Sequence, residues 1–294
     1  MASYDFVTVD VFTTTRFGGN PLAVFPDARG LTDAQMQALA AEFNLSETTF
    51  VLPPEQPGST ARVRIFNRTT EMPFAGHPMV GTGYVLAKAG RATDGVLVFE
   101  VPAGLVRVEV AFTDGQPAGG VIAAPRPLVT EPSLTPAQVA ACATLDEADV
   151  VLANHAPVLA SVGIPFVIAE TTPEALTRAQ PDLEAFRRCV AADPQLGDRL
   201  ALHLYAWEGG ALRARMFAPP SGTVEDPATG SANATLGALL LSLTEAEAAS
   251  YEVTQGVEMG RPSRLSLTAR RASDGVRATV GGSCVPVLSG KAEV

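Results

Sequence analysis

The chain has 294 residues and a formal net charge of −10, and 47% of its residues are hydrophobic. This length predicts about two domains, and the apolar fraction is enough to give each domain its own core. The acidic balance argues against a surface for nucleic acid or for an anionic membrane. Glycine and proline together make up 49 residues, above the usual share of about 12%, which favours short strands joined by tight turns.

Neither a targeting segment nor a disulfide framework is expected. Met1–Asp5 lacks the basic and apolar regions of a signal peptide, and no run of 18 apolar residues occurs, so we expect a soluble cytoplasmic protein. Cys142, Cys189 and Cys284 are widely spaced and form no metal or redox motif. They are predicted to be core thiols in a reducing compartment.

The first elements form a predicted hairpin followed by a surface helix. Tyr4–Phe12 alternates polar and apolar residues, and the turn Gly18–Pro21 leads into a second strand, Leu22–Phe25. Thr32 and Gln35 have the spacing of a capping box, which predicts a helix starting there. The apolar face expected to cover a core consists of Met36, Leu39, Ala40 and Phe43.

Two glycine turns about half a chain apart indicate that the chain is built twice. Phe74–Pro78 follows a predicted alternating strand, Arg62–Asn67, and Asp226–Ala232 follows the similar strand Leu212–Ala218. Each turn leads to a predicted helix and then to a strand interrupted by proline and glycine, Val96–Val110 in one half and Tyr251–Leu267 in the other. A second capping box with proline at its first helical position, Thr135–Gln138, is taken as further support for duplication.

The two helices after the turns, Met79–Ala89 and Asn233–Leu243, have no polar stripe and are therefore predicted to be buried on all sides. In a chain otherwise made of strands, a strongly curved sheet or barrel around each helix would achieve this. The predicted fold class is thus α+β, with two pseudo-symmetric domains, each a mainly antiparallel sheet around a central helix. We expect the halves 1–122 and 123–275, with the C-terminal strand 276–294 joined to the first.

The N-terminus of each buried helix is a predicted anion site. Its N–H groups and the positive end of its dipole are free, and Gly76 and Gly230 let a ligand approach the backbone. Two such ends facing one another across a cleft between the domains would hold a small carboxylate compound.

Three side chains near these segments could carry chemistry. Glu47 follows a helix end and starts an apolar strand, where desolvation would raise its pKa and suit it to acid–base work. Asp226 and His77 lie in the two turns. Taken singly, each has a plain structural interpretation: a solvated strand start for Glu47, a helix cap for Asp226 and a loop histidine for His77.

Four segments together resemble the signature segments of the PhzF family, the phenazine-biosynthesis isomerase and its relatives. They are Asn44–Val51, Pro73–Pro78, Glu225–Ala232 and Gln255–Ser263, and the similarity runs in order along essentially the whole chain. The resemblance implies a fold like that of diaminopimelate epimerase, an active site in the cleft between the two domains, and catalysis without cofactor or metal. It also implies a homodimer.

By this resemblance, Glu47 is the proton shuttle, with His77 and Asp226 as further catalytic residues. The implied reaction is cofactor-independent isomerisation of a small carboxylate, of the trans-2,3-dihydro-3-hydroxyanthranilate type, with one carboxyl group removing and returning the proton. The backbone N–H groups of both turns, that of His77 included, would hold the substrate carboxylate. The substrate-binding residues implied are Asn20, Gly76, Gly230 and Ser231.

The chain departs from the epimerases of this fold, which carry a catalytic cysteine just before each turn glycine. Ala75 and Thr229 stand there instead, so inversion between two thiols is not available. No G-x-S-x-G or nucleotide-binding glycine motif occurs, and His155 and His203 lack metal-ligand spacing and are expected to have structural partners.

Two alternatives remain open at this point: a non-catalytic protein that binds a small carboxylate, and an epimerase-related enzyme with a different substrate. Specificity is expected to come from loops lining the cleft, such as Pro53–Thr60 and Ala218–Val224. Nucleic acid and membranes are not expected as partners.

Overall fold

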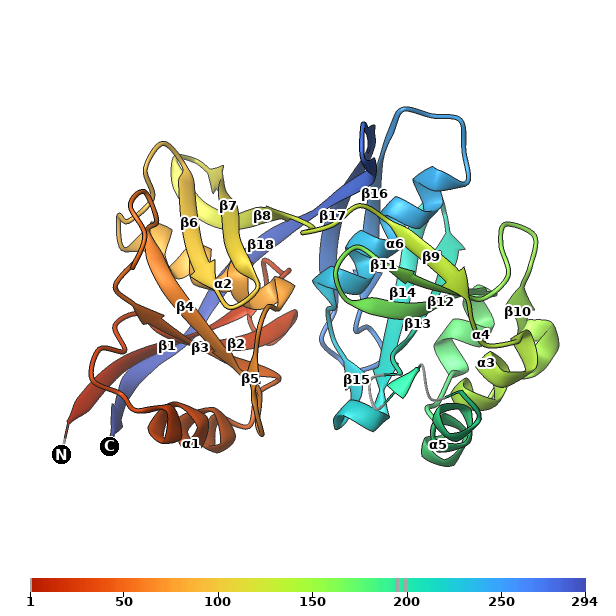
Figure 1. Ribbon diagram of the computed structural model, residues 1–294, viewed down its shortest axis with the longest axis horizontal. Helices are drawn as coiled ribbons and strands as arrows, with labels where there is room; N and C mark the ends of the chain where they lie inside the picture. Colours follow the sequence, from red (N-terminus) through yellow and green to blue (C-terminus); the bar gives the residue numbers. More distant parts are fainter. Residues whose placement is uncertain (1, 194–195, 198–199) are drawn as a thin grey trace. The chain divides into compact units, whose positions relative to one another are not determined.

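The computed structural model describes residues 2–193, 196–197 and 200–294. The chain divides into two compact units (Figure 1). Unit 1 consists of Met1–Ala123 and Gly281–Val294, and unit 2 consists of Ala124–Val280. Strand β18 (Gly275–Glu293) crosses from unit 2 into unit 1, so the C-terminal segment of the chain belongs to the sheet of unit 1. The predicted α+β class is confirmed, because each unit is a curved sheet around a buried helix.

The strands of unit 1 close on themselves. Neighbouring strands pair in the order β7, β6, β4, β3, β2, β1, β18, β8 and again β7. The short strand β5 pairs with β4. The elements are β1 (Ser3–Val11), β2 (Asn20–Phe25), α1 (Asp33–Phe43), β3 (Glu47–Leu52), β4 (Ala61–Phe66), β5 (Glu71–Met72), α2 (Gly76–Lys88), β6 (Val96–Val101), β7 (Gly104–Thr113) and β8 (Gln116–Ala123).

In unit 2 the neighbouring strands pair in the order β9, β11, β12, β13, β14, β16 and β17. The short strand β10 also pairs with β12, and β15 pairs with β14. The strands are β9 (Val129–Pro132), β10 (Val150–Val151), β11 (Val158–Ser161), β12 (Pro165–Thr171), β13 (Leu202–Glu208), β14 (Ala211–Ala218), β15 (Thr223–Asp226), β16 (Ala248–Gln255) and β17 (Ser263–Ala272). The helices are α3 (Pro136–Ala143), α4 (Pro173–Arg178), α5 (Leu183–Ala192) and α6 (Gly230–Ser242).

The duplication predicted from the sequence is confirmed by strand pairing. The parallel pairs β2–β3 and β4–β6 recur as β12–β13 and β14–β16, and the antiparallel pairs β3–β4 and β6–β7 recur as β13–β14 and β16–β17. One side-chain cluster also recurs. Arg64 binds Glu71 through Nε and Nη2 and covers the ring of Phe66, as Arg215 binds Glu225 and covers Phe217.

The capping boxes at Thr32 and Thr135 are both present, each with its glutamine side chain bonded back to the threonine N–H. The equivalence inferred from them was wrong, however. Helix α1 connects the parallel strands β2 and β3, whereas the helices that connect their counterparts β12 and β13 are α4 and α5. Helix α3 precedes β12, so its capping box is a local signal for a helix start and carries no information about the repeat.

The central helices α2 and α6 are buried along almost their whole length, as their apolar sequences predict. Helix α2 packs against β1, β2, β3, β7 and β8, and α6 packs against β11, β12, β16 and β17. Both begin three residues earlier than predicted, at Gly76 and Gly230. Pro78 does not delay the start of α2, because the N–H group that proline lacks has no intrahelical partner in a first turn.

Close packing around α2 makes its glycines sensitive to substitution. A Cβ atom at Gly81 would lie 2.6 Å from Leu22 Cδ2 and 2.8 Å from Val11 Cγ2. Gly81→Ala is therefore expected to lower the free energy of unfolding by about 1–3 kcal/mol, the usual cost of overpacking a core. Gly237→Ala in α6 is the matched control with a smaller effect, because its Cβ would approach Leu267 only to 3.3 Å. Urea unfolding of both variants measures the difference, and equal losses would contradict it.

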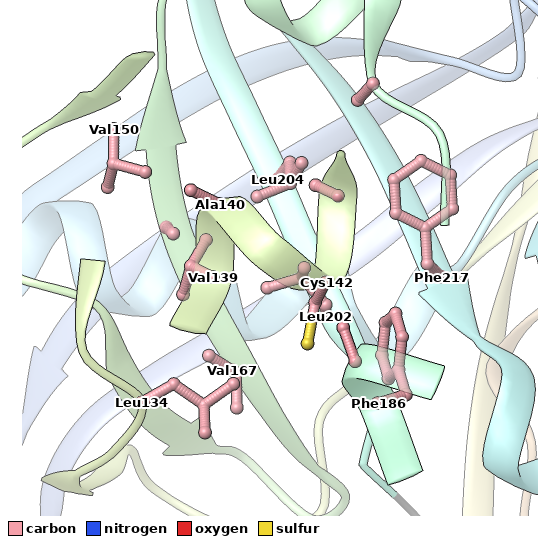
Figure 2. Packing of buried hydrophobic residues seen from close by; sticks show 14 of the residues in the cluster. Leu134, Val139, Ala140, Cys142, Val150, Val167, Phe186, Leu202, Leu204 and Phe217 are labelled. Carbon is pink, nitrogen blue, oxygen red and sulfur yellow. The ribbon is translucent and has the colours of Figure 1, made fainter. Parts of the chain in front are cut away.

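Each unit has a second core on the outer face of its sheet. In unit 1 this core is aromatic and includes Phe25 stacked on Phe50, with ring centroids 4.9 Å apart. In unit 2 the second core is formed by α3 and α5 packed against β12 and β13, and Figure 2 shows Val139 and Cys142 of α3 among its residues.

The three cysteines are buried free thiols, as predicted, and the sulfur atoms of Cys142 and Cys189 are 3.6 Å apart. None of the helices in the described part of the chain is long and apolar enough to cross a membrane.

Candidate active site

In unit 1, strand pairing brings the predicted site residues together. Glu47 is the first residue of β3, which runs parallel to β2 with Glu47 opposite Leu22. Asn20 is the first residue of β2 and is fully buried. Its Oδ1 accepts a hydrogen bond from Ser46 Oγ at 3.2 Å. Because the starts of parallel strands lie at the same edge of a sheet, Asn20 and Glu47 share that edge.

His77, in the first turn of α2, faces the same carboxylate. Its Nε2 lies 3.4 Å from Glu47 Oε2, and the two side chains are 6% and 14% exposed. Burial lowers the pKa of His77 to about 3, against the opposing effect of a hydrogen bond to the backbone of Pro21. Since proline has no N–H, this bond runs from the imidazole to the Pro21 carbonyl. His77 is therefore a neutral polar partner of Glu47, not a cation beside it.

The low pKa of His77 predicts a pH dependence of stability. Between its ordinary pKa of about 6.5 and its folded-state pKa of about 3, the unfolded chain binds a proton at this residue that the folded chain does not. Stability from this residue is thus complete above pH 6.5 and is lost as the pH falls, by about 1.4 kcal/mol per pH unit. We therefore expect the free energy of unfolding, measured in urea between pH 6 and pH 4, to fall less steeply with acidification in His77→Gln than in the wild-type protein. The difference in slope should be about 1.4 kcal/mol per pH unit. An unchanged slope would show that His77 is protonated in the folded protein.

The first turns of α2 and α6 have the character of anion sites. Gly76 and Gly230 are the first helical residues, and the capping positions before them, Ala75 and Thr229, provide no side-chain hydrogen bond to the helix N–H groups. These N–H groups and the positive end of each helix dipole therefore remain available for an anionic ligand. Ser231, the next residue of α6, is half-buried.

In unit 2, Asp226 is the last residue of β15 and is 8% exposed. Its Oδ2 accepts a hydrogen bond of 2.6 Å from Thr229 Oγ1. Asp226 does not cap α6, because Thr229 occupies the capping position. Asp226 is thus bonded to the residue that precedes α6, whose first residues are Gly230 and Ser231.

The register of the repeat shows that the predicted site residues of the two units are chemically different. Thr48 pairs with Phe66 as Leu202 pairs with Phe217, so the position of Glu47 corresponds to Ala201 in unit 2. By the same comparison, Asp226 pairs with Met216 as Met72 pairs with Ile65. Glu47 and Asp226 are therefore carboxylates whose counterparts in the other unit, Ala201 and Met72, are apolar.

One expectation about specificity loops was wrong. The segment Pro53–Thr60 follows the end of β3 at Leu52, so it lies at the opposite end of that strand from Glu47. The buried Glu100 carboxylate holds this loop by accepting hydrogen bonds from the backbone N–H groups of Glu55 and Gln56. The other segment, Ala218–Val224, leads from β14 into β15 and hence to Asp226.

Of the two remaining histidines, His155 has structural partners, as expected, whereas neither ring nitrogen of the buried His203 has a hydrogen-bond partner in the part of the chain that the structure describes. His155 Nε2 lies 2.9 Å from the hydroxyl of Tyr205, which donates to the buried Glu170. His203 is fully buried in β13. Among residues 2–193, 196–197 and 200–294, no three His, Cys, Asp or Glu side chains are grouped so that they could hold a metal ion.

Sequence reasoning missed Gln255 as a residue bonded to the turn that carries Asp226, although it starts one of the quoted segments. Its buried side chain is bonded to the backbone of both Asp226 and Thr229. The sequence did offer one signal: a polar residue stands at the end of a predicted strand of alternating polar and apolar residues, directly before a glycine.

Comparison with known proteins identifies the family of the chain. Residues 9–290 match the family model PhzC-PhzF, described as phenazine biosynthesis-like protein. An uncharacterized isomerase of Mesorhizobium japonicum is 38% identical, with 99% of each chain covered. Trans-2,3-dihydro-3-hydroxyanthranilate isomerase of Pseudomonas aeruginosa is 37% identical, with 98% of each chain covered.

A solved structure agrees with this assignment at the level of the fold. The phenazine biosynthesis protein of the PhzF family from Bacillus anthracis superimposes with a TM-score of 0.89 at 24% identity, with both chains fully covered. The family match spans nearly the whole sequence, and so does the structural similarity. The chain belongs to the phenazine biosynthesis-like family PhzC-PhzF.

Proposed function

We propose that the protein is a cofactor-independent isomerase of a small carboxylate in which Glu47 removes and returns a proton. The isomerase class rests on relatives similar along the whole chain that are named isomerases. The observation that carries the catalytic assignment is the contact of 3.4 Å between Glu47 Oε2 and His77 Nε2 in a largely buried site. It joins a carboxylate that is partly desolvated with a neutral imidazole, at a helix N-terminus that favours an anionic substrate.

A single base is favoured by the asymmetry of the repeat. Inversion at carbon needs one acid–base group on each face of the substrate, and the counterpart of Glu47 is Ala201, which cannot transfer protons. The cysteines of the related epimerases are likewise replaced, by Ala75 and Thr229. One carboxyl group can still take a proton from one carbon and return it to another on the same face. Isomerisation by proton transfer within the substrate is therefore better supported than racemisation.

The candidate substrate is trans-2,3-dihydro-3-hydroxyanthranilate, the compound named for the relative from Pseudomonas aeruginosa. In our proposal the N–H groups at Gly76, His77, Gly230 and Ser231 bind its carboxylate. Glu47 takes the proton from the ring carbon that bears the hydroxyl group and delivers it to another ring carbon. Tautomerisation of the resulting enol then gives the ketone.

The other polar residues assist this transfer. His77 is neutral at physiological pH, and its one N–H group donates to the Pro21 carbonyl, so the Nε2 atom beside Glu47 can only accept a hydrogen bond. Asp226 and Ser231 are proposed to contact the polar groups of the substrate, and Asn20 to bind it beside Glu47. The homodimer stays a prediction, which sedimentation equilibrium of the purified protein would test.

The test is proton NMR of the purified protein with this compound in deuterated water, without added cofactor. We expect isomerisation with one deuterium incorporated at the carbon that receives the proton, to the extent that Glu47 exchanges with solvent during turnover. A protein that binds the compound, seen as a raised unfolding temperature, but neither converts nor exchanges it would be a carboxylate-binding protein. Absence of both binding and conversion would exclude this substrate, and other small cyclic carboxylates would then be tested.

A further inference from the structure

A buried amide, Gln255, spans the turn that carries Asp226. It is the last residue of β16 and is 1% exposed. Its Nε2 donates to the Asp226 carbonyl at 2.8 Å, and its Oε1 accepts from the Thr229 N–H at 3.1 Å. A backbone carbonyl can only accept and a backbone N–H can only donate, so these two bonds fix the orientation of the amide. Gln255 therefore holds both ends of the segment between β15 and α6.

The same amide sets the direction of the bond to the Asp226 carboxylate. Thr229 Oγ1 donates to Asp226 Oδ2 at 2.6 Å and accepts from Gln255 Nε2 at 3.2 Å. A hydroxyl group has one proton, so receiving a hydrogen bond from the amide turns that proton toward the carboxylate. One carboxylate oxygen of Asp226 is thereby held through Thr229 by Gln255.

Gln255 is itself held from α6. Asn233, which is fully buried, donates from Nδ2 to Gln255 Oε1 at 2.7 Å and to the Thr229 carbonyl at 3.0 Å. The neighbouring His203 is neutral, because burial lowers its pKa to about 4 against the opposing effect of the Asn233 side chain. With two bonds donated and two accepted, Gln255 uses its full hydrogen-bonding capacity. A buried amide whose hydrogen bonds are all made is held rigidly in place.

This network is absent from the repeat in unit 1. Arg213 pairs with Thr254 in unit 2 as Arg62 pairs with Glu100 in unit 1, so Thr254 corresponds to Glu100. Gln255, the next residue, therefore corresponds to Val101, which is buried. The counterpart of Asp226 is Met72. The amide thus occurs in the unit whose turn carries a carboxylate and is replaced by an apolar residue in the unit whose turn does not.

We propose that Gln255 is a positioning residue of the reaction, which fixes the Asp226 carboxylate in the orientation needed at the substrate. The inference rests on the proposed function, in which Asp226 contacts the substrate. The glycine after Gln255 fits the same role: Gly256 has a φ of +76°, and a Cβ there would lie 2.5 Å from the Pro227 carbonyl oxygen. The end of β16 is therefore packed directly against the turn that Gln255 holds.

The test is the near-isosteric change Gln255→Glu, because an ionised carboxylate accepts hydrogen bonds but donates none. With trans-2,3-dihydro-3-hydroxyanthranilate, we expect kcat to fall about 10- to 100-fold while KM changes less than about threefold. The matched control is Gln138→Glu in the capping box of α3, which makes the same chemical change in the same unit and should leave turnover unchanged. In an Asp226→Asn background, Gln255→Glu should cost less than about threefold more, since its target is already lost. Equal losses in both backgrounds would reduce Gln255 to a structural residue and overturn the proposal.

A crystal structure of full-length Gln255→Leu separates this proposal from the identity of the substrate. We expect Thr229 Oγ1 to leave Asp226 Oδ2 while α6 keeps its position. An unchanged contact in that structure would overturn the positioning role, even if the wild-type protein proved inactive on the candidate compound. Should the leucine variant not fold, the structure of Gln255→Glu gives the same comparison.

Discussion

Replacement of Glu47 with glutamine is expected to lower kcat on the candidate substrate by about 10²- to 10⁴-fold, the usual contribution of a positioned general base. The amide has nearly the same shape as the carboxylate and can still meet His77 Nε2, so the fold of unit 1 should be retained. Substrate binding should also be retained, because the carboxylate of the substrate is proposed to be held by helix N–H groups and not by Glu47. Steady-state kinetics and ligand-induced stabilisation, measured on one preparation, check both parts.

Glu42→Gln is the matched control for this variant. Glu42 is an exposed residue near the end of α1 in the same unit, and its replacement removes the same charge. It should leave kcat and the unfolding temperature close to the wild-type values. Full activity of Glu47→Gln would remove Glu47 from the mechanism, whereas loss of both activity and binding would show that the carboxylate is needed to form the site.

Local signals in the sequence were sufficient for much of the fold. The capping box at Thr32, the apolar helices after both glycine turns and the alternation of the flanking strands each depend on neighbours a few residues away, and the structure confirms them. The match between Arg64 and Arg215 was also visible, because each is followed two residues later by phenylalanine. What the alternation could not predict was that these arginines bind glutamates on the next short strand.

Other features depend on which strands become neighbours, and no pattern along the chain predicts that. Glu47 and His77 are separated by 30 positions, and their contact exists only because β3 packs against α2. The resemblance suggested this pairing, whereas periodicity alone did not. The Pro53–Thr60 loop was misplaced for the same reason, since its distance from Glu47 follows from the direction of β3. Likewise, the bonds made by Gln255 to Asp226 require β16 to lie beside the end of β14.

The repeat provides a second prediction of large effect, in which one half of the molecule serves as the control for the other. Arg215 is almost completely buried and bonded to Glu225 by two parallel hydrogen bonds of 2.8 and 2.9 Å. Its Nη1 also donates to the carbonyls of Leu176 and Ala179 at the end of α4. Arg64 makes the same paired bonds to Glu71, but 17% of its side chain is exposed.

Arg215→Met is therefore expected to lower the free energy of unfolding of unit 2 by about 3–5 kcal/mol, because it leaves the Glu225 charge and two carbonyls without their partner. Arg64→Met should cost unit 1 only about 1–2 kcal/mol, since water can replace the lost partner at an exposed site. Trp207 is the single tryptophan of the chain and lies in β13, so its fluorescence in urea reports on unit 2. Far-UV circular dichroism reports on both units.

The two signals together decide whether burial or the shared motif sets the contribution of these arginines. If burial decides, Arg215→Met shifts the Trp207 transition strongly, whereas Arg64→Met shifts the circular dichroism transition of unit 1 only slightly. Losses of equal size in the two units would mean that the bidentate pair and the ring beneath it set the energy, whatever their exposure. That outcome would mean that the repeated cluster stabilises each unit by the same amount, independently of how deeply its arginine is buried.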